Sequence, residues 1–133
     1  MSDKPVYEKL MIKPGRKVRF INAPAGYDTI LGGLPVGVTV VEDARSAQAV
    51  DVVQMFVANR AELEARLPGV RAVLRPGDIL WVTYLKGTSK IKTDINRETI
   101  NAYAHTIGLE GVSIVSVDDD WSAMRFRLIE KED

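Results

Sequence analysis

The residues best suited to bind a ligand follow the longest apolar run of the sequence, at residues 86–90. This segment supplies two cations, Lys86 and Lys90, two hydroxyls, Thr88 and Ser89, and a flexible glycine. Ammonium and hydroxyl groups are donors that suit an anion such as phosphate or carboxylate. The segment therefore predicts an anion-binding loop; the alternative is a solvated connection whose polar residues cap the next helix.

No catalytic residue is predicted. The segment lacks the G-x-x-x-x-G-K-[ST] order of a P-loop, and no serine elbow, acid–base carboxylate pair or metal-histidine motif can be assembled. The sole histidine, His105, falls at helical spacing near Glu98 and Asn101, which places it on a solvated face. The sequence has no cysteine, which excludes thiol catalysis. Tyr84 or Lys86 could act only if burial shifted a pKa.

Three consecutive carboxylates, Asp118, Asp119 and Asp120, raise the question of a metal site. Hard cations such as Ca²⁺ and Mg²⁺ prefer carboxylate oxygens. Three adjacent side chains in a tight turn do not easily point at one ion, and the EF-hand spacing is absent. We expect no metal site here, and we expect Trp121 to pack over the sheet edge.

Buried strands must position these side chains. Residues 78–85 form an apolar run bounded by turn signals, which is typical of a strand buried on both faces. A five-residue link joins the last two strands, so they are expected to form a hairpin. The other strands are predicted at residues 17–22, 38–41, 51–57, 112–117 and 123–129.

Helices are predicted between the strands. The first covers residues 27–34, and the second begins at Asn59, with Glu62 as the partner in a capping box. Pro68 is expected to interrupt that helix and to start a short one over residues 68–74. A helix over residues 95–107 is expected to be capped by Thr93 or Asp94 and to end at Gly108. Residues 1–9 are expected to be a flexible tail, and residues 10–133 one domain.

This order of elements predicts a three-layer, Rossmann-like α/β sheet with a mostly parallel centre and an antiparallel end. Ligands of such sheets bind beyond the carboxyl ends of the parallel strands. The loop after the first strand, residues 22–26, lacks the three glycines that cradle a pyrophosphate. The side chains expected at this edge are those of Asn22, Asp43, Asn59, Arg60, Tyr84, Lys86, Thr88, Ser89, Lys90, Thr93 and Asp94.

Composition narrows the class of partner. Eighteen basic residues balance 18 acidic ones in 133 residues, whereas a nucleic-acid binder is expected to be basic. The start of the sequence is polar and carries no apolar signal-peptide region, and the longest apolar run is far too short for a membrane span. We therefore expect a cytoplasmic protein without nucleic-acid or membrane partners.

Two family resemblances add to this reading. Residues 74–82 resemble the helix-to-strand passage of class I S-adenosylmethionine-dependent methyltransferases, and the closing hairpin is similar to their usual ending, which implies a methyltransferase-like fold. A more specific resemblance is to the bacterial family called domain of unknown function 3052, which implies a bacterial protein without an assigned activity. It is carried by residues 12–15 (IKPG), 51–53 (DVV), 80–82 (LWV) with Lys86, and 120–123 (DWSA) followed by Arg125.

The leading hypothesis is a non-catalytic domain without a cofactor. It would bind a small anionic molecule or a protein partner at the carboxyl edge through Lys86, Ser89 and Lys90. The alternative is a reduced transferase that uses S-adenosylmethionine, with Asn22, Asp43 and Asn59 lining the cofactor groove. A third hypothesis is a structural subunit of a homo-oligomer.

Overall fold

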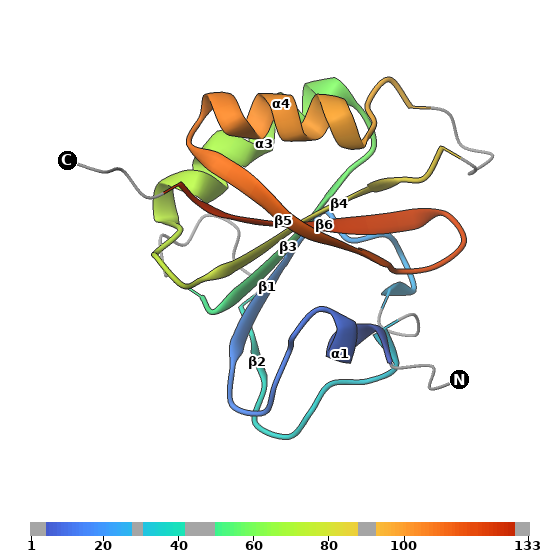
Figure 1. The fold of residues 1–133 in the computed structure, drawn as a ribbon. Helices are drawn as coiled ribbons and strands as arrows, with labels where there is room; N and C mark the ends of the chain where they lie inside the picture. Colours follow the sequence, from blue (N-terminus) through green and yellow to red (C-terminus); the bar gives the residue numbers. More distant parts are fainter. Residues whose placement is uncertain (1–4, 28–30, 42–49, 88–92, 130–133) are drawn as a thin grey trace.

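The computed structural model describes residues 5–27, 31–41, 50–87 and 93–129. At its centre lies a six-stranded sheet in the order β2-β1-β3-β4-β6-β5 (Figure 1). The strands are β1 (Lys17–Ile21), β2 (Thr39–Val40), β3 (Val52–Val57), β4 (Ile79–Leu85), β5 (Leu109–Ser116) and β6 (Trp121–Leu128). The helices are α1 (Val6–Lys9), α3 (Arg60–Val73) and α4 (Arg97–Thr106).

The sheet is parallel from β2 to β4 and antiparallel from β4 to β5, so the predicted topology is confirmed. All residues of β3 and β4 are buried. A strand in the middle of a parallel sheet is covered on both faces, which explains the uninterrupted apolar runs. The antiparallel β6 alternates instead, because its outward side chains reach solvent at Arg127.

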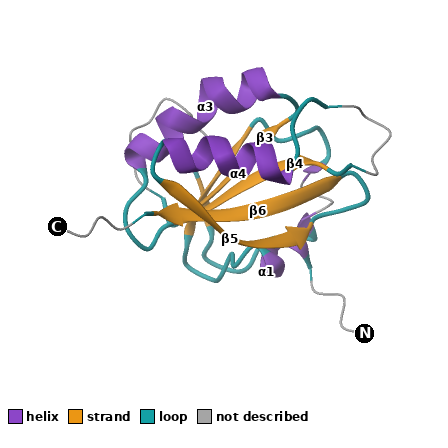
Figure 2. Ribbon diagram, turned by 45° about the horizontal axis from the view of Figure 1, so that its top comes forward, coloured by secondary structure: helices purple, strands orange, loops and turns teal. Residues whose placement is uncertain are grey.

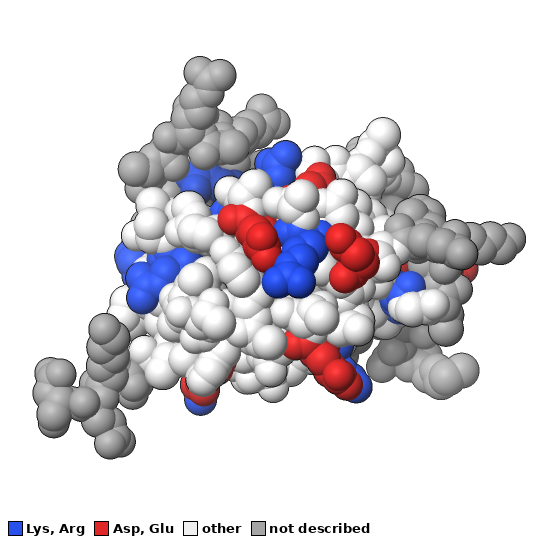
Figure 3. All heavy atoms as spheres, turned by 90° about the horizontal axis from the view of Figure 1, so that it is seen from above, with Lys and Arg blue, Asp and Glu red and all other residues white. Residues whose placement is uncertain are grey.

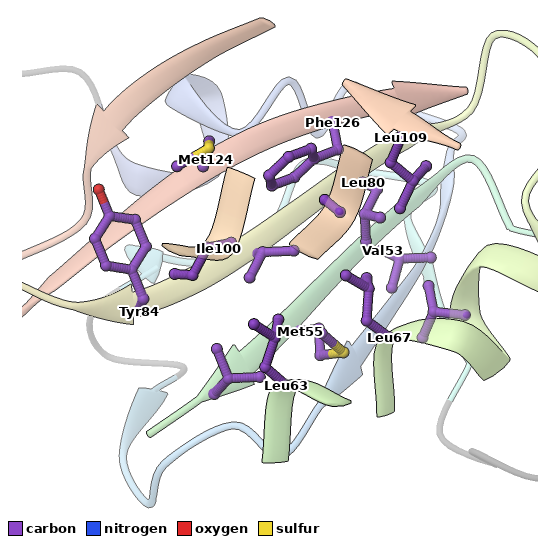
Figure 4. Packing of buried hydrophobic residues seen from close by; sticks show 14 of the residues in the cluster. Val53, Met55, Leu63, Leu67, Leu80, Tyr84, Ile100, Leu109, Met124 and Phe126 are labelled. Atoms are coloured by element: carbon purple, nitrogen blue, oxygen red, sulfur yellow. The ribbon is translucent and has the colours of Figure 1, made fainter. Parts of the chain in front are cut away.

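Helices α3 and α4 cover one face of the sheet, while α1 lies against the opposite face (Figures 1 and 2). Under α3 and α4, apolar side chains from both helices interdigitate with those of β3, β4 and β6 (Figure 4). On the α1 face, Trp81 is 1% exposed and donates its indole N–H to the carbonyl of Leu10 at 2.9 Å. That bond ties the segment after α1 to the central strand.

The predicted break at Pro68 is wrong, because α3 continues through it to Val73. Proline inside a helix removes one backbone hydrogen bond and costs about 3 kcal/mol relative to alanine. Here Pro68 is exposed, while Leu67 and Val70 on either side of it are buried against the sheet. Burial of this apolar stripe holds the helix together across the proline.

Two other expectations need correction, one on the cap of α4 and one on the N-terminal tail. α4 is capped by Asn96, which forms a reciprocal capping box with Thr99, and not by Thr93 or Asp94. Within the expected tail, residues 6–9 form α1 with Val6 buried; residues 1–4 lie outside the described part. The helix predicted over residues 27–34 falls partly on residues 28–30, which are also outside it.

Candidate functional site

The strand order reverses beside β1. The chain passes from β1 to β2 on one side and then to β3 on the other, and β1, β2, β3 and β4 all run in the same direction. Their carboxyl ends therefore meet at one edge, with a crevice expected between β1 and β3. We call this the carboxyl edge of the sheet; α3 and α4 begin there too.

The loop after β1, residues 22–26, is built from small residues. Asn22 turns the chain with a φ of 60°, a left-handed conformation that asparagine tolerates better than most residues. Gly26 has a φ of 80°, and no atom lies within 4 Å of the position of an added Cβ. Within the described residues, the amide N–H groups of Ala25 and Gly26 have no protein acceptor. The loop thus presents open backbone donors at the crevice.

Glu62 of α3 holds the two sides of the crevice together. Its Oε1 accepts from the amide of Ala58 at 2.7 Å, and its Oε2 accepts from Nδ2 of Asn22 at 3.2 Å. The same Nδ2 donates to the carbonyl of Phe56 at 3.1 Å. Asn59 caps α3 by accepting from the amide of Glu62 at 2.9 Å. Asn22 and Asn59 therefore both contact Glu62 at this edge, and their role in lining a ligand groove stays a prediction.

The segment before α4 also docks on this edge. Thr93 donates its hydroxyl to the carbonyl of Ala58 at 2.6 Å, and Asp94 accepts from the amide of Arg60 at 2.7 Å. These bonds explain why neither residue caps α4, since each satisfies a backbone group at the β3–α3 junction instead. The first turn of α3 consequently already has carboxylate and amide acceptors.

The predicted anion loop has a different environment from the one expected. Lys86 donates its ammonium group to Oγ of Ser116 at 2.7 Å, and its amide bonds to the carbonyl of Asp120. Its charge thus ties the tip of the β5–β6 hairpin to the end of β4. The other predicted contacts, Thr88, Ser89, Lys90 and Asp43, lie outside the described residues.

Tyr84 lies near the end of β4 and packs with the core beneath α4. Figure 4 shows its hydroxyl pointing away from the neighbouring core side chains. Burial raises the pKa of this phenol above its usual value, while the nearby Arg97 lowers it. Tyr84 is therefore a neutral donor at the carboxyl edge near neutral pH.

A row of aromatic rings crosses the sheet on its α1 face. The ring centroids of Tyr27 and Phe56 are 4.7 Å apart, and those of Phe56 and Trp121 are 5.2 Å apart, each pair edge to face. The Tyr27 hydroxyl donates to Oε1 of the fully buried Gln54 at 2.6 Å. Burial is the main cause that raises the pKa of Tyr27. These contacts anchor the chain directly after the loop of residues 22–26.

At the acidic tip of the β5–β6 hairpin, a carboxylate forms hydrogen bonds with backbone amides. Oδ1 of Asp118 accepts from the amides of Asp120 and Trp121, both at 2.8 Å. Across the described ranges, no three histidine, cysteine or acidic side chains are grouped so that they could hold a metal ion. His105 is exposed in the last turn of α4, as predicted.

Sequence reasoning missed Glu62 as a site residue. It was identified only as a partner in the cap of α3, a role in which its side chain reaches Ala58 rather than Asn59. Its bond to Asn22 spans 40 residues of chain, and no local pattern predicts such a contact. A carboxylate in the first turn of a helix that follows a parallel strand was the available signal.

Comparison with known proteins identifies the fold. A scan against protein-family models and a search of curated proteins gave no match. Solved structures similar to this chain include a ribosomal protein L11 methylase from Lactobacillus delbrueckii subsp. bulgaricus, with a TM-score of 0.63 and 10% identity over 94% of this chain and 75% of that one. A TehB-like SAM-dependent methyltransferase from Corynebacterium glutamicum has a TM-score of 0.60 and 15% identity over 96% and 89%. A DhpI–SAH complex has a TM-score of 0.60 and 14% identity over 86% and 78%.

The fold is thus methyltransferase-like and Rossmann-like. The comparison corrects the leading hypothesis of a non-catalytic domain without a cofactor. The similar structures named above are methyltransferases or an SAH complex, which favours the alternative, a transferase that uses an adenosyl cofactor. No helix in the described ranges could span a membrane.

Proposed function

We propose that this chain is a reduced transferase that binds S-adenosylmethionine, or its product S-adenosylhomocysteine, between the carboxyl ends of β1 and β3. One observation carries the proposal. The loop of residues 22–26 lies where the strand order reverses, and it combines small side chains with open amide groups. The methyltransferase-like fold supports the same location.

The chemistry of the loop fits this cofactor better than a dinucleotide. An adenosyl cofactor has no pyrophosphate, so it does not need the cradle that three glycines provide. Its carboxylate would accept from the amides of Ala25 and Gly26. Its ammonium group would lie near Glu62, whose two oxygens accept from Asn22 and Ala58 at the ends of β1 and β3. Asp43, which follows β2 in the sequence, would bind a ribose hydroxyl.

When bound, S-adenosylmethionine supplies an electrophilic methyl group. The residues of this chain would orient the cofactor and exclude water from it. Asn22 and Asn59 would line the groove, and the edge formed by Phe56 and Trp121 would shield it. His105 is exposed in the last turn of α4, at the other end of that helix from the carboxyl edge. The substrate atom that receives the methyl group must therefore be nucleophilic without help from an imidazole base.

The finer expectations from the sequence belong to this proposal. We propose a bacterial, cytoplasmic protein related to domain of unknown function 3052, with the predicted single domain of residues 10–133 extended to include α1. The similarity of residues 12–15 and 120–123 to that family supports this relationship. Self-association into a homo-oligomer is part of the same proposal.

A thermal-shift titration with S-adenosylhomocysteine tests the proposed function. A ligand at 100 times its Kd stabilises a fold by about 2.7 kcal/mol. Ala25→Phe, which adds a large ring to the exposed loop that would bind the cofactor, should abolish this stabilisation. Ala72→Phe is the matched control, because Ala72 is exposed near the end of α3 and away from the crevice. No shift in the wild type, or an equal shift in Ala25→Phe, would refute the proposal.

A further inference from the structure

A second concave region lies at the opposite edge of the sheet, which we call the amino edge. It has a volume of about 670 Å³, within the range of small-molecule sites. It is lined by the end of α3, the turn before β4 and the end of β6. Three arginines, Arg71, Arg125 and Arg127, are among the residues that line it.

Arg125 has a charge without a counter-ion. Its Nε is buried and has no hydrogen-bond partner. Its Nη1 lies 3.4 Å from the sulfur of Met11, which is a weak acceptor. In the part of the chain that the structure describes, Arg125 forms no ion pair. A partly buried charge without a partner is costly, so the group is suited to gain its partner from a ligand.

The other two arginines each have one protein acceptor that orients the side chain, and each keeps further N–H donors. Arg71 donates its Nε–H to the carbonyl of Ile107 at 3.0 Å, which fixes its side chain beneath the end of α4. Arg127 pairs with Glu110 at 2.7 Å, yet its side chain remains 63% exposed. Each guanidinium has five N–H donors, so both keep donors for another acceptor.

Among the described residues that line this region, the one carboxylate is already neutralised. Asp78 accepts from Nε and Nη2 of Arg75, both at 3.0 Å, and from the amide of Arg75 at 2.8 Å. Its side chain is only 8% exposed. Asp78 therefore offers little repulsion to an incoming anion. The surface over α3 and α4 differs from this arginine-lined region, because it carries both basic and acidic groups, interspersed among uncharged ones (Figure 3).

We propose that the amino-edge pocket formed around Arg71, Arg125 and Arg127 binds a phosphate group. The guanidinium fork matches the geometry of phosphate oxygens and forms paired, charge-assisted hydrogen bonds with them. The group is either free phosphate or the end of a phosphomonoester. This site shares no lining residue with the crevice between β1 and β3, so the inference is independent of the proposed transferase function.

Isothermal titration calorimetry of the full chain with inorganic phosphate tests this inference. The wild type should bind phosphate, and Arg125→Met and Arg71→Met should each weaken the affinity at least about tenfold, the loss of one charge-assisted contact of roughly 1.4 kcal/mol. Arg66→Met is the matched control, because Arg66 is exposed on α3 and outside the pocket. Without phosphate, Arg125→Met should melt no lower than the wild type, since it removes an unpaired charge.

Titration with glycerol phosphate separates the two sources. An affinity at least tenfold above that for phosphate would identify a phosphomonoester, and equal affinities would identify free phosphate; both support the site. No heat at millimolar phosphate in the wild type would overturn the inference. So would wild-type affinity in both Arg125→Met and Arg71→Met. If Arg125→Met does not fold, Arg71→Met gives the same decision, because it removes one bond to the carbonyl of Ile107 but no residue of the apolar core.

Discussion

The two edges of the sheet have opposite chemistry. At the carboxyl edge, the acceptors of Asn59, Glu62 and Asp94 surround the start of α3, next to a loop of small residues. At the amino edge, Arg71 and Arg125 lie around the end of the same helix. A helix carries partial positive charge at its start and partial negative charge at its end. Glu62 in the first turn of α3 and Arg71 in its last turn both suit this dipole.

The two edges also differ in the kind of contact that builds them. Much of the carboxyl edge is arranged by hydrogen bonds to backbone groups, such as those of Thr93 and Asp94. The amino edge depends on side chains of α3 and β6 that converge across the fold. Substitutions can thus disturb one edge, the other, or the sheet that holds both.

The largest effect is expected from Trp81→Ala, which removes the support shared by both edges. Trp81 is 1% exposed, and the substitution leaves a cavity and an unpaired carbonyl at Leu10. We expect a loss of about 3–5 kcal/mol in the free energy of unfolding, measured with urea. Val36→Ala, at a position 90% exposed, should change it little. A loss below about 1 kcal/mol for Trp81→Ala would contradict the packing described.

Tyr27→Phe is expected to affect the carboxyl edge next most strongly. It leaves the buried Oε1 of Gln54 without its donor, which costs about 1–3 kcal/mol at neutral pH.

The pH dependence of this variant provides a second readout. Burial raises the pKa of Tyr27 in the folded state above the value of about 10 for an unfolded chain. The wild type therefore has the full contribution of Tyr27 below pH 10, and loses it as the pH rises towards the folded pKa. Tyr27→Phe should show a smaller alkaline loss, measured by urea unfolding between about pH 9 and 11. An unchanged slope would show that Tyr27 is not the group that titrates.

Glu62→Ala separates the two edges directly. It removes acceptors from the amide of Ala58 and from Nδ2 of Asn22, which should cost about 1–2 kcal/mol of stability. It should also weaken binding of S-adenosylhomocysteine while leaving phosphate binding at the amino edge unchanged. Glu98→Ala, at an exposed position in the first turn of α4, is the control. Loss of both ligands together would mean that the edges are not independent.

Glu110→Ala should have the smallest effect on stability. The pair of Glu110 with Arg127 is largely exposed, and exposed pairs contribute between about 0 and 1 kcal/mol. Freed from this partner, Arg127 should bind phosphate up to a few-fold more tightly, as calorimetry would show. Weaker phosphate binding in this variant would indicate that Glu110 orients Arg127 rather than competing for it.

The sequence predicted features that neighbouring residues determine better than features that depend on contacts between distant segments. Strands β3 and β4 were predicted to within one residue, because burial on both faces imposes a continuous apolar run. The cap of α4 was not, because Thr93, Asp94 and Asn96 all suit a cap locally, and two of them instead satisfy the start of α3. Propensity at Pro68 was overridden by burial of Leu67 and Val70.

The sites were harder to predict than the strands. Strand order alone brings the ends of β1 and β3 to one edge, so Asn22 and Asn59 both lie there, while their contact with a ligand stays a prediction. The ligand contact of Lys86 stays a prediction, and its bond to Ser116 was not predicted because the two residues are 30 positions apart in the sequence. The arginine pocket was missed entirely, since Arg71 and Arg125 belong to segments whose meeting depends on the complete fold.

A titration of ¹⁵N-labelled protein with S-adenosylhomocysteine, followed by the amide resonances, tests the central claim most directly. We expect saturable shifts at the amides of Ala25 and Gly26, with smaller ones at Asn59 and Glu62 and none at Arg71. Resonances that do not move, or shifts confined to residues away from the loop of residues 22–26, would contradict an adenosyl cofactor at the carboxyl edge.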